Sequence, residues 1–281
     1  MKLPGNLLVV GADGVIGTAL VSALSRVGSH VLGSSRRPDS RWLPLDMELP
    51  VDTALLPEAQ SVFLCAGING FAACDADPAK AARVNVEATL AIGTHYLQRG
   101  AHVVFLSSTA VFGSRSDAPD EGASMAPDTT YGAFKCASEV ALLAFARRAP
   151  GTCAIVRLTK VLSAQTPLLQ KWRRGSPIDA FTDSMVCPVS LSFVVQGLLQ
   201  IAQTRAVGCL HLAGAQTLSY AALAQALVRQ GRLANAVVRE ISQVNRETSG
   251  VESPCVSLTM TQTSQKLGIR AQTLEHCLLD L

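Results

Sequence analysis

The sequence of 281 residues has little charge and few aromatic side chains. Asp, Glu, Lys and Arg make up 16% of it and Phe, Trp and Tyr 5%, whereas hydrophobic residues reach 48%. This composition excludes an extensively disordered chain, because enough apolar side chains are present to form a large core. The net charge of +3 is small, and basic residues occur only in short pairs such as Arg147-Arg148. A nucleic-acid-binding surface is therefore not predicted.

Long apolar runs and ligand-spaced cysteines are also lacking. No apolar run approaches the roughly 20 residues of a membrane span, and the run at 6–10 is too short for the core of a signal peptide. The eight cysteines contain no C-x-x-C pair, and the five histidines are scattered. We therefore expect a cytoplasmic protein with reduced thiols, no bound metal and no membrane association.

What the sequence does contain is an alternation of short apolar runs with amphipathic segments. Continuous apolar strands joined by helices are typical of a parallel sheet that is buried on both faces. The sequence therefore predicts an α/β protein with a Rossmann-type doubly wound parallel sheet. Strands are predicted at 6–10, 30–35, 42–46, 61–67, 102–108 and 153–158, and helices at 15–28, 78–98 and 129–149.

The pattern loosens after residue 162, which divides the chain into two predicted parts. Residues 1–162 are predicted to form a dinucleotide-binding domain, and residues 163–281 a smaller α/β substrate-binding lobe on the same core. No linker or low-complexity segment separates them. In the second part, helical patterns surround the strand-like "GCLHLA" and lie at 168–174, 190–203, 217–231 and 259–267.

The glycine-rich turn "GADGVIG" lies between the first predicted strand and the first predicted helix. Gly11 would allow the tight turn, Gly14 a close approach by a pyrophosphate, and Gly17 close packing of helix and strand. The helix N-terminus would supply backbone N–H groups to the phosphates. The residues predicted to bind a dinucleotide here are Gly11, Asp13, Gly14, Val15, Ile16 and Gly17.

A second group of residues, Tyr131, Lys135 and Ser108, suggests proton transfer. Tyr131 and Lys135 are four residues apart and project from one helical face. An ammonium at ~4 Å and an effective dielectric near 20 is worth roughly 4 kcal/mol, or about three units in the pKa of the phenol. Ser108, at the end of a predicted strand, could hydrogen-bond the same substrate oxygen. Alone, Tyr-x-x-x-Lys is also an ordinary exposed helix pair, so the prediction rests on the combination with the glycine turn.

This combination resembles the extended short-chain dehydrogenase/reductases, which join a G-x-x-G-x-x-G turn to a Ser/Thr–Tyr–Lys set. The segment "FLSSTAVFG" is similar to the S-x-x-V-[YF]-G segment of that family, which implies Ser108 as the catalytic hydroxyl. The segment "CDADPAKAARVNVEAT" is similar to the helix that carries the family's Asn, here Asn85, which supports a water leading to Lys135. The resemblance further implies cofactor contacts by Asp46, Met47, Cys65, Ala66 and Gly67.

Within this superfamily the chain is most similar to the sugar-nucleotide reductases and epimerases, especially the dTDP-4-dehydrorhamnose reductase-like group. "VRLTKVLS" and "GCLHLAGAQTLSYAALAQAL" carry this resemblance. Two segments depart from it: 157–162 lacks the group's Trp, and 186–189 replaces its G-S-P-T. Both are expected at the substrate, so a rhamnose precursor does not follow from the resemblance.

The second predicted strand ends in "GSSRRPD", where dinucleotide-binding folds that prefer NAD carry an acid. Here the residues are Ser34, Ser35, Arg36 and Arg37, and the position of the acid falls on Ser35. A serine can hydrogen-bond a 2′-phosphate without repelling it. The Arg36 guanidinium offers paired donors to the phosphate oxygens and can stack on the adenine ring. Alternatively, the arginines only solubilise a surface loop. We predict NADP(H) as cofactor, with Arg36 as the main selector.

These features predict an NADP(H)-dependent oxidoreductase that reduces a carbonyl, or oxidises a secondary alcohol, of a sugar-nucleotide-like or other polar substrate. Tyr131 would donate the proton, Ser108 would orient the oxygen, and Lys135 would tune Tyr131 and hold the nicotinamide ribose. Two alternatives remain open: a non-catalytic NADP-binding regulatory or scaffold subunit, and a sugar-nucleotide epimerase. The expected partner is a small-molecule substrate, and a homodimer is an open alternative to a monomer.

Overall fold

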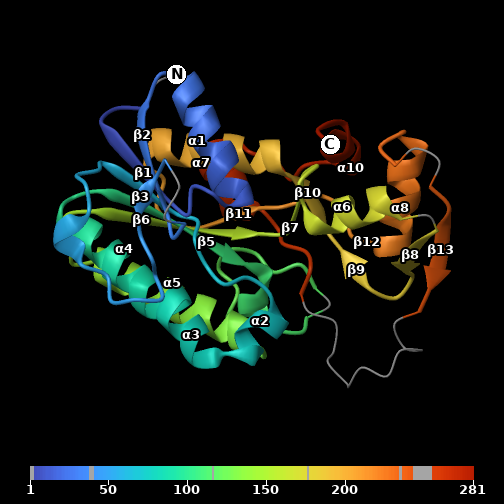
Figure 1. Ribbon diagram of the computed structural model, residues 1–281, viewed down its shortest axis with the longest axis horizontal. Coiled ribbons are helices and arrows are strands. Elements are labelled where there is room, and N and C mark those ends of the chain that lie inside the picture. The colour runs from blue at the N-terminus through green and yellow to red at the C-terminus, as the bar shows by residue number, and fades with distance from the viewer. Residues whose placement is uncertain (1–2, 38–40, 116, 176, 234–235, 243–254) are drawn as a thin grey trace.

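A seven-stranded parallel sheet forms the centre of the computed structural model, which describes residues 3–281 except 38–40, 116, 176, 234–235 and 243–254 (Figure 1). The strand order β11-β6-β5-β4-β1-β2-β3 reverses between β1 and β4, which confirms the predicted doubly wound Rossmann-type sheet. Its strands are β1 (Asn6–Val10), β2 (His30–Ser35), β3 (Leu43–Pro44), β4 (Ser61–Leu64), β5 (His102–Ser108), β6 (Thr152–Leu158) and β11 (Gly208–Leu212).

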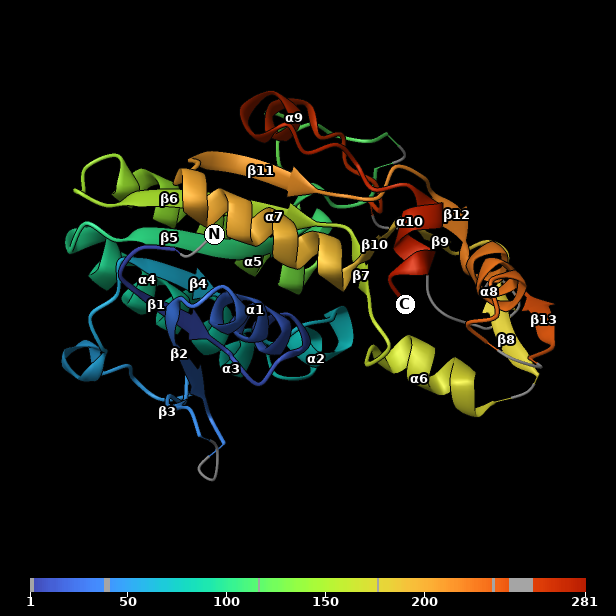
Figure 2. The ribbon, with the colours of Figure 1, turned by 90° about the horizontal axis from the view of Figure 1, so that it is seen from above.

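Helices cover both faces of this sheet (Figure 2). Successive side chains of β1 enter opposite cores: Val9 packs on one face and Leu8 and Val10 on the other. This two-sided burial is the reason for the continuous apolar runs of the sequence. Among the described residues, no helix is both long and apolar enough to cross a bilayer. One face carries α1 (Val15–Arg26) and α7 (Leu191–Thr204), and the other α3 (Pro78–Ala82), α4 (Thr89–Gln98) and α5 (Thr130–Ala146).

The helix predicted over 78–98 contains a wider turn in its middle. Residues Arg83–Ala88 form a π-helical turn between α3 and α4, and Thr89 donates its hydroxyl to the carbonyl of Val84. Single π-helical turns in helices are frequent at functional sites, and Asn85 lies in this one. A short helix, α2 (Phe71–Ala76), precedes it and was not predicted, since six residues are too few for a recognisable helical period.

Residues 163–281 contribute both to the large sheet with its helices and to a separate, smaller group of helices and strands. Within these residues, β11 extends the large sheet beside β6, and α7 packs beside α1. The smaller body lies at the right of Figure 1 and has a core that includes Trp172, Ile178 and Leu227. Helix α9 (Thr261–Leu267) lies instead beside β11, against the core of the large sheet. The other elements after β6 are β7 (Lys160–Leu162), α6 (Pro167–Arg174), β8 (Ile178–Phe181), β9 (Met185–Val186), β10 (Pro188–Ser190), β12 (Leu218–Ser219), α8 (Tyr220–Arg229), β13 (Val238–Ile241) and α10 (Leu274–Leu279). Short 3-10 helices lie in the N-terminal part, at Thr53–Leu55 and Thr109–Phe112.

A buried carboxylate, Glu121, ties the loop after β5 to the start of α9. Its oxygens accept hydrogen bonds from the backbone N–H groups of Gln262 and Thr263, at 3.0 and 2.8 Å, and from the Thr263 hydroxyl at 2.8 Å. The same hydroxyl accepts from the backbone of His211 on β11. Burial acts to raise the pKa of Glu121, but the hydrogen bonds from Thr263 and Gln262 outweigh it and hold the pKa below its ordinary value.

We expect Glu121→Gln to lower the free energy of unfolding at pH 7 by about 1–3 kcal/mol, because an amide cannot accept all three bonds. A carboxyl whose pKa is lowered by folding stabilises the protein above its unfolded pKa, and this contribution is lost as the pH falls. Urea unfolding should therefore separate the two proteins at pH 7 and bring them together toward pH 3. Exposed Glu87 is the control, and an equal loss for Glu87→Gln would contradict this role.

Candidate active site

The glycine turn after β1 is closely packed at two of its glycines and open at the third. A Cβ atom on Gly11, whose φ is +85°, would lie 2.8 Å from Cα of Ala66, and one on Gly17 would lie 2.1 Å from the carbonyl oxygen of Gly11. On Gly14, which precedes α1, a Cβ would meet only this oxygen, at 3.4 Å. The space over Gly14 and the N-terminus of α1 is therefore free, as an approaching phosphate requires.

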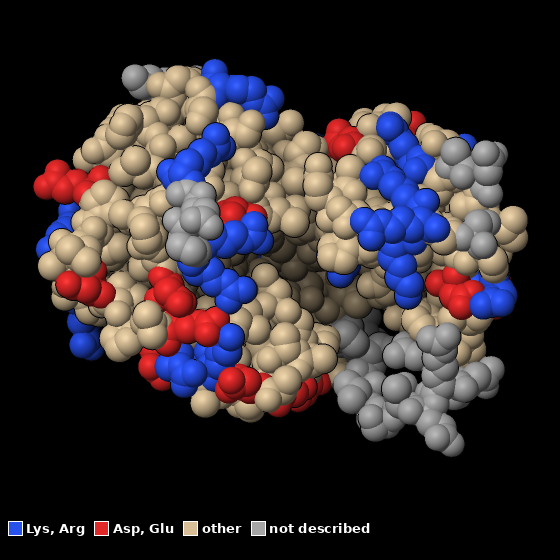
Figure 3. Space-filling model, in the orientation of Figure 1, with Lys and Arg blue, Asp and Glu red and all other residues tan. Residues whose placement is uncertain are grey.

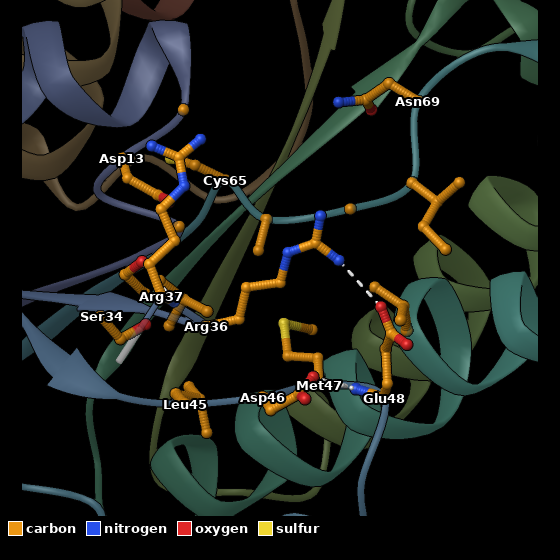
Figure 4. A pocket seen from close by; sticks show the side chains of 18 residues that line it. Asp13, Ser34, Arg36, Arg37, Leu45, Asp46, Met47, Glu48, Cys65 and Asn69 are labelled. Atoms are coloured by element: carbon orange, nitrogen blue, oxygen red, sulfur yellow. Dashed lines mark hydrogen bonds and ion pairs between the residues drawn. The ribbon is translucent and has the colours of Figure 1, made fainter. Parts of the chain in front are cut away.

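A cavity of about 400 Å³ opens beside this turn, between the ends of β1, β2 and β4 (Figure 4). Most residues predicted to bind the cofactor line it, but Val15, Ile16, Tyr131 and Lys135 do not. Val15 lines an adjoining cavity and Ile16 packs against the core, whereas Tyr131 and Lys135 line neither cavity. The predicted residues that line the first cavity are Gly11, Asp13, Gly14, Ser34, Ser35, Arg36, Arg37, Asp46, Met47, Cys65, Ala66 and Gly67.

The adjoining cavity, of about 660 Å³, begins at the same turn and is lined further by residues 162–165 and by Ser192 of α7. In the space-filling view the surface is hollowed between the large and small bodies (Figure 3). Of the two segments expected at the substrate, 157–162 and 186–189, only Leu162 lines either cavity. Arg157 instead lies buried under the sheet with Glu139.

The two arginines at the end of β2 are exposed and already paired with acids (Figure 4). Arg36 Nη1 lies 2.8 Å from Glu48 Oε1, with the side chain 65% exposed. Arg37 Nε lies 3.3 Å from Asp13 Oδ2, with the side chain 74% exposed. Glu48 also holds Lys80 Nζ at 2.9 Å. Such exposed pairs contribute little to stability, so a phosphate could exchange with the acids at small cost.

Lys135 is buried at the carboxyl end of β5. Its Nζ donates to the carbonyl of Leu106 at 2.9 Å and lies 4.6 Å from the centroid of the Phe105 ring. Burial lowers the pKa of Lys135 to about 8, against the opposing effect of the Glu139 carboxylate. The Lys135 ammonium lies near Tyr131, as the spacing of the two residues predicts, with 5.8 Å between Nζ and the centroid of the phenol ring.

Tyr131 keeps its proton more firmly than the sequence analysis predicts. Burial raises its pKa to about 12, and a hydrogen bond with Ser108 lowers it only in part. The expected lowering by Lys135 is thus wrong for the protein without ligand, because desolvation outweighs an ammonium at this distance. The phenol donates to Oδ1 of Asn69 at 3.5 Å, and the ring meets Phe71 edge-on at 6.1 Å. Tyr131 is therefore a neutral hydrogen-bond donor at pH 7.

Asn85 holds the loop that follows β4. Its Oδ1 accepts from the backbone N–H of Ile68 at 2.8 Å, and its Nδ2 donates to the carbonyl of Ile68 at 3.0 Å. The backbone carbonyl of Asn85 accepts from the hydroxyl of Ser138 on α5 at 2.8 Å. A Cβ on Gly67 would lie 3.0 Å from Asn85 Oδ1 and 3.8 Å from Lys135 Nζ, so the three residues adjoin. The proposed water route to Lys135 remains a prediction.

Several residues of the site were not identified from the sequence. Asn69 and Phe71 contact Tyr131 from a loop whose course depends on tertiary contacts, and no local pattern indicates them. Glu48 follows the predicted adenine contacts directly, but its pairing with Arg36 has no local signature. Glu139 lies four residues after Lys135 on the same helical face, which predicts that the two are neighbours, but the spacing does not show that both are buried. In the described part of the chain, no cluster of His, Cys, Asp and Glu is arranged to hold a metal ion.

Comparison with known proteins identifies the family. The model of the RmlD substrate binding domain matches residues 5–280. The chain belongs to this family. The predicted resemblance to dTDP-4-dehydrorhamnose reductases and to the short-chain dehydrogenase/reductases is therefore confirmed. The chain matches none of the curated proteins with which its sequence was compared.

Solved structures share the fold over nearly the whole length. MoeE5 in complex with UDP-glucuronic acid and NAD is 25% identical, with a TM-score of 0.84 over 98% of this chain and 97% of that one. The dTDP-4-dehydrorhamnose reductase of Bacillus anthracis, in complex with NADP, is 17% identical, with a TM-score of 0.81 over 98% and 97%. The UDP-glucose 4-epimerase of Thermotoga maritima, with UDP-glucose, is 19% identical, with a TM-score of 0.80 over 98% and 96%.

The raised pKa of Tyr131 can be tested by absorbance titration. Burial also raises the pKa of Tyr96 to about 12 and shifts that of Tyr220 upward. We therefore expect the folded, ligand-free protein to form less phenolate at about pH 10 than the protein in guanidinium, whose tyrosines should titrate near their ordinary pKa. A phenolate that forms near pH 7 to 8 and disappears in Tyr131→Phe would show instead that Lys135 dominates.

Proposed function

We propose that the protein is an NADP(H)-dependent oxidoreductase that reduces a carbonyl, or oxidises a secondary alcohol, of a sugar-nucleotide-like or other polar substrate. The proposal is carried by the grouping of Ser108, Tyr131 and Lys135 next to Gly67, in the loop that packs on the open glycine turn. A site that only binds a nucleotide needs no proton donor next to a buried ammonium. The family, and relatives solved with UDP-sugars and with NAD or NADP, support it.

The residues of the turn and the cavity suit a dinucleotide. The N-terminus of α1 and Gly14 would hold the pyrophosphate, Asp46 and Met47 would adjoin the adenine, and the loop at 65–67 the nicotinamide ribose. A bound nicotinamide supplies hydride to, or removes it from, the substrate carbon. We expect the ribose hydroxyls to hydrogen-bond Lys135, whose burial beside Gly67 places it at that loop.

In the reducing direction, the chain's own residues move the proton. The substrate oxygen replaces Asn69 as the acceptor of the Tyr131 hydroxyl, and Ser108 donates a second hydrogen bond to it. As the proton leaves, the phenolate is stabilised by the ammonium of Lys135, so the pKa of Tyr131 falls when it is needed. Such general acid catalysis typically contributes about 10²- to 10⁴-fold.

An epimerase is the second candidate, because the fold is shared with the UDP-glucose 4-epimerase of Thermotoga maritima. An epimerase must return the hydride to the opposite face of the same substrate, so its nucleotide has to stay bound between the two half-reactions. Purified protein that retains stoichiometric, non-exchanging nucleotide would favour this candidate. A reductase exchanges its nucleotide in every turnover and consumes NADPH in proportion to product.

We expect Tyr131→Phe to lower turnover by about 100-fold or more while the dissociation constant of NADPH stays nearly unchanged, because only the proton donor is lost. The assay is NADPH oxidation with 4-keto sugar nucleotides and simple ketones, combined with a fluorescence titration of NADPH. Tyr96→Phe is the control, since Tyr96 donates to the carbonyl of Pro57 at 2.6 Å, away from the cavity. Turnover that survives in Tyr131→Phe would remove the mechanism.

We expect NADP(H) to bind at least about tenfold more tightly than NAD(H), which corresponds to 1.4 kcal/mol. Arg36→Ala should weaken NADPH binding more than NADH binding, and Ser35→Asp combined with Arg36→Ala should erase or invert the preference. Glu48→Gln should strengthen NADPH binding, because the acid that competes for Arg36 is neutralised. Equal binding of both cofactors to the wild-type protein would return the arginines to a solubilising role.

A further inference from the structure

We propose that Glu139 and Arg157 are positioning residues for Lys135: the Glu139 carboxylate, held by Arg157 under the sheet, keeps the Lys135 ammonium charged and in place. This inference deepens the proposed function and rests on it for its catalytic meaning. It concerns two residues that touch neither cavity. Their role is to act through Lys135 rather than on a substrate.

Glu139 on α5 and Arg157 on β6 form a bidentate ion pair. Nε of Arg157 donates to both oxygens of Glu139, each at 3.1 Å, and Nη2 donates to Oε2 at 2.7 Å. The side chains are 3% and 0% exposed, and the ring of Phe112 lies 4.8 Å from the guanidinium carbon. A paired geometry of this kind fixes the orientation of the carboxylate as well as its charge.

Glu139 and Lys135 lie on one face of α5, since four residues separate them along the helix. Both are buried, so their attraction is weakly screened. The other titratable groups that act on Lys135 are the thiols of Cys65 and Cys74, whose pKa values burial raises, so both are neutral at pH 7. Of these three described groups, Glu139 is therefore the one whose negative charge acts on the Lys135 ammonium at pH 7.

The ammonium needs this charge because burial works against it. With the carboxylate present, burial already lowers the pKa of Lys135 to about 8. Without the carboxylate, a larger fraction of Lys135 would be neutral at pH 7 and could not stabilise a phenolate at Tyr131. Arg157 has the complementary task, because a buried carboxylate without a partner takes up a proton and loses its charge.

The test measures the pKa of Lys135 directly, by following the Cε signals of ¹³C-labelled lysine in NMR spectra of the full chain over a pH series. Lys135→Met assigns the signal. The main variant is Glu139→Gln combined with Arg157→Met, which removes both charges of the pair, so that neither residue is left as an unpaired buried ion. We expect the pKa of Lys135 to fall by about one unit, because the Glu139 carboxylate raises this pKa and Arg157 is not among the groups that act on it.

Glu121→Gln is the matched control, because Glu121 is a buried, hydrogen-bonded carboxylate that does not act on Lys135. It should leave the Lys135 titration unchanged. If the double variant does not fold, Glu139→Asp keeps the charge but withdraws it by one methylene, and a smaller fall of the pKa is expected. An unchanged titration in either folded variant would overturn the proposal and leave the pair with a packing role.

The same variants separate this inference from the proposed function. The alkaline limb of kcat with NADPH should move to lower pH together with the Lys135 signal, while KM below that limb stays nearly constant. A shifted NMR titration without any turnover in the wild-type protein would uphold the electrostatic role and refute the enzyme. Turnover in the wild-type protein together with an unshifted Lys135 titration in the variants would support the enzyme and refute the electrostatic role of the pair.

Discussion

The burial of one ammonium group, that of Lys135, is the constraint to which the rest of the site conforms. A buried cation is costly unless charge and hydrogen bonds compensate for it. Here the compensation comes from separate parts of the chain: the carbonyl of Leu106 at the end of β5, and Glu139 one turn along α5. Gly67 leaves the space that a side chain would take. The order of the sheet makes this possible, because β4 and β5 are parallel neighbours and end at the same edge.

The two halves of the proposed cofactor site are connected by contacts between turns. Gly11 packs against the backbone of Ala66, so the turn after β1 and the loop after β4 are in direct contact. Asn85 then fixes that loop by two hydrogen bonds to Ile68, and Ser138 fixes Asn85 from α5. Asn85 lies within the π-helical turn at 83–88, between α3 and α4. We therefore expect a change at any of these contacts to affect the binding of both the pyrophosphate and the nicotinamide ribose of a dinucleotide.

The sequence predicted those parts of the molecule that follow a local period. Two-sided burial makes a strand such as β4 apolar throughout, and the spacing of Tyr131 and Lys135 places both on one face of α5. Spacing does not report burial, however, and burial decides that the pKa of Tyr131 rises. The contact between Tyr131 and Asn69 was equally inaccessible, because it joins residues 62 positions apart. Local patterns thus identified the chemical groups, and tertiary packing determines their protonation.

The ion pairs around the site differ in exposure, and this difference suits them to different tasks. Arg36 shares Glu48 with Lys80 at the surface, where salt screens the pairs and partners exchange at little cost. Arg36 could exchange its pairing with Glu48 for a pairing with a phosphate, so this exposed network suits the recognition of a charged ligand. The buried pair of Arg157 and Glu139 has no comparable alternative, because separation would leave a charge without water or partner. A group that must keep one charge and one position during proton transfer is therefore better placed next to the buried network than next to the exposed one.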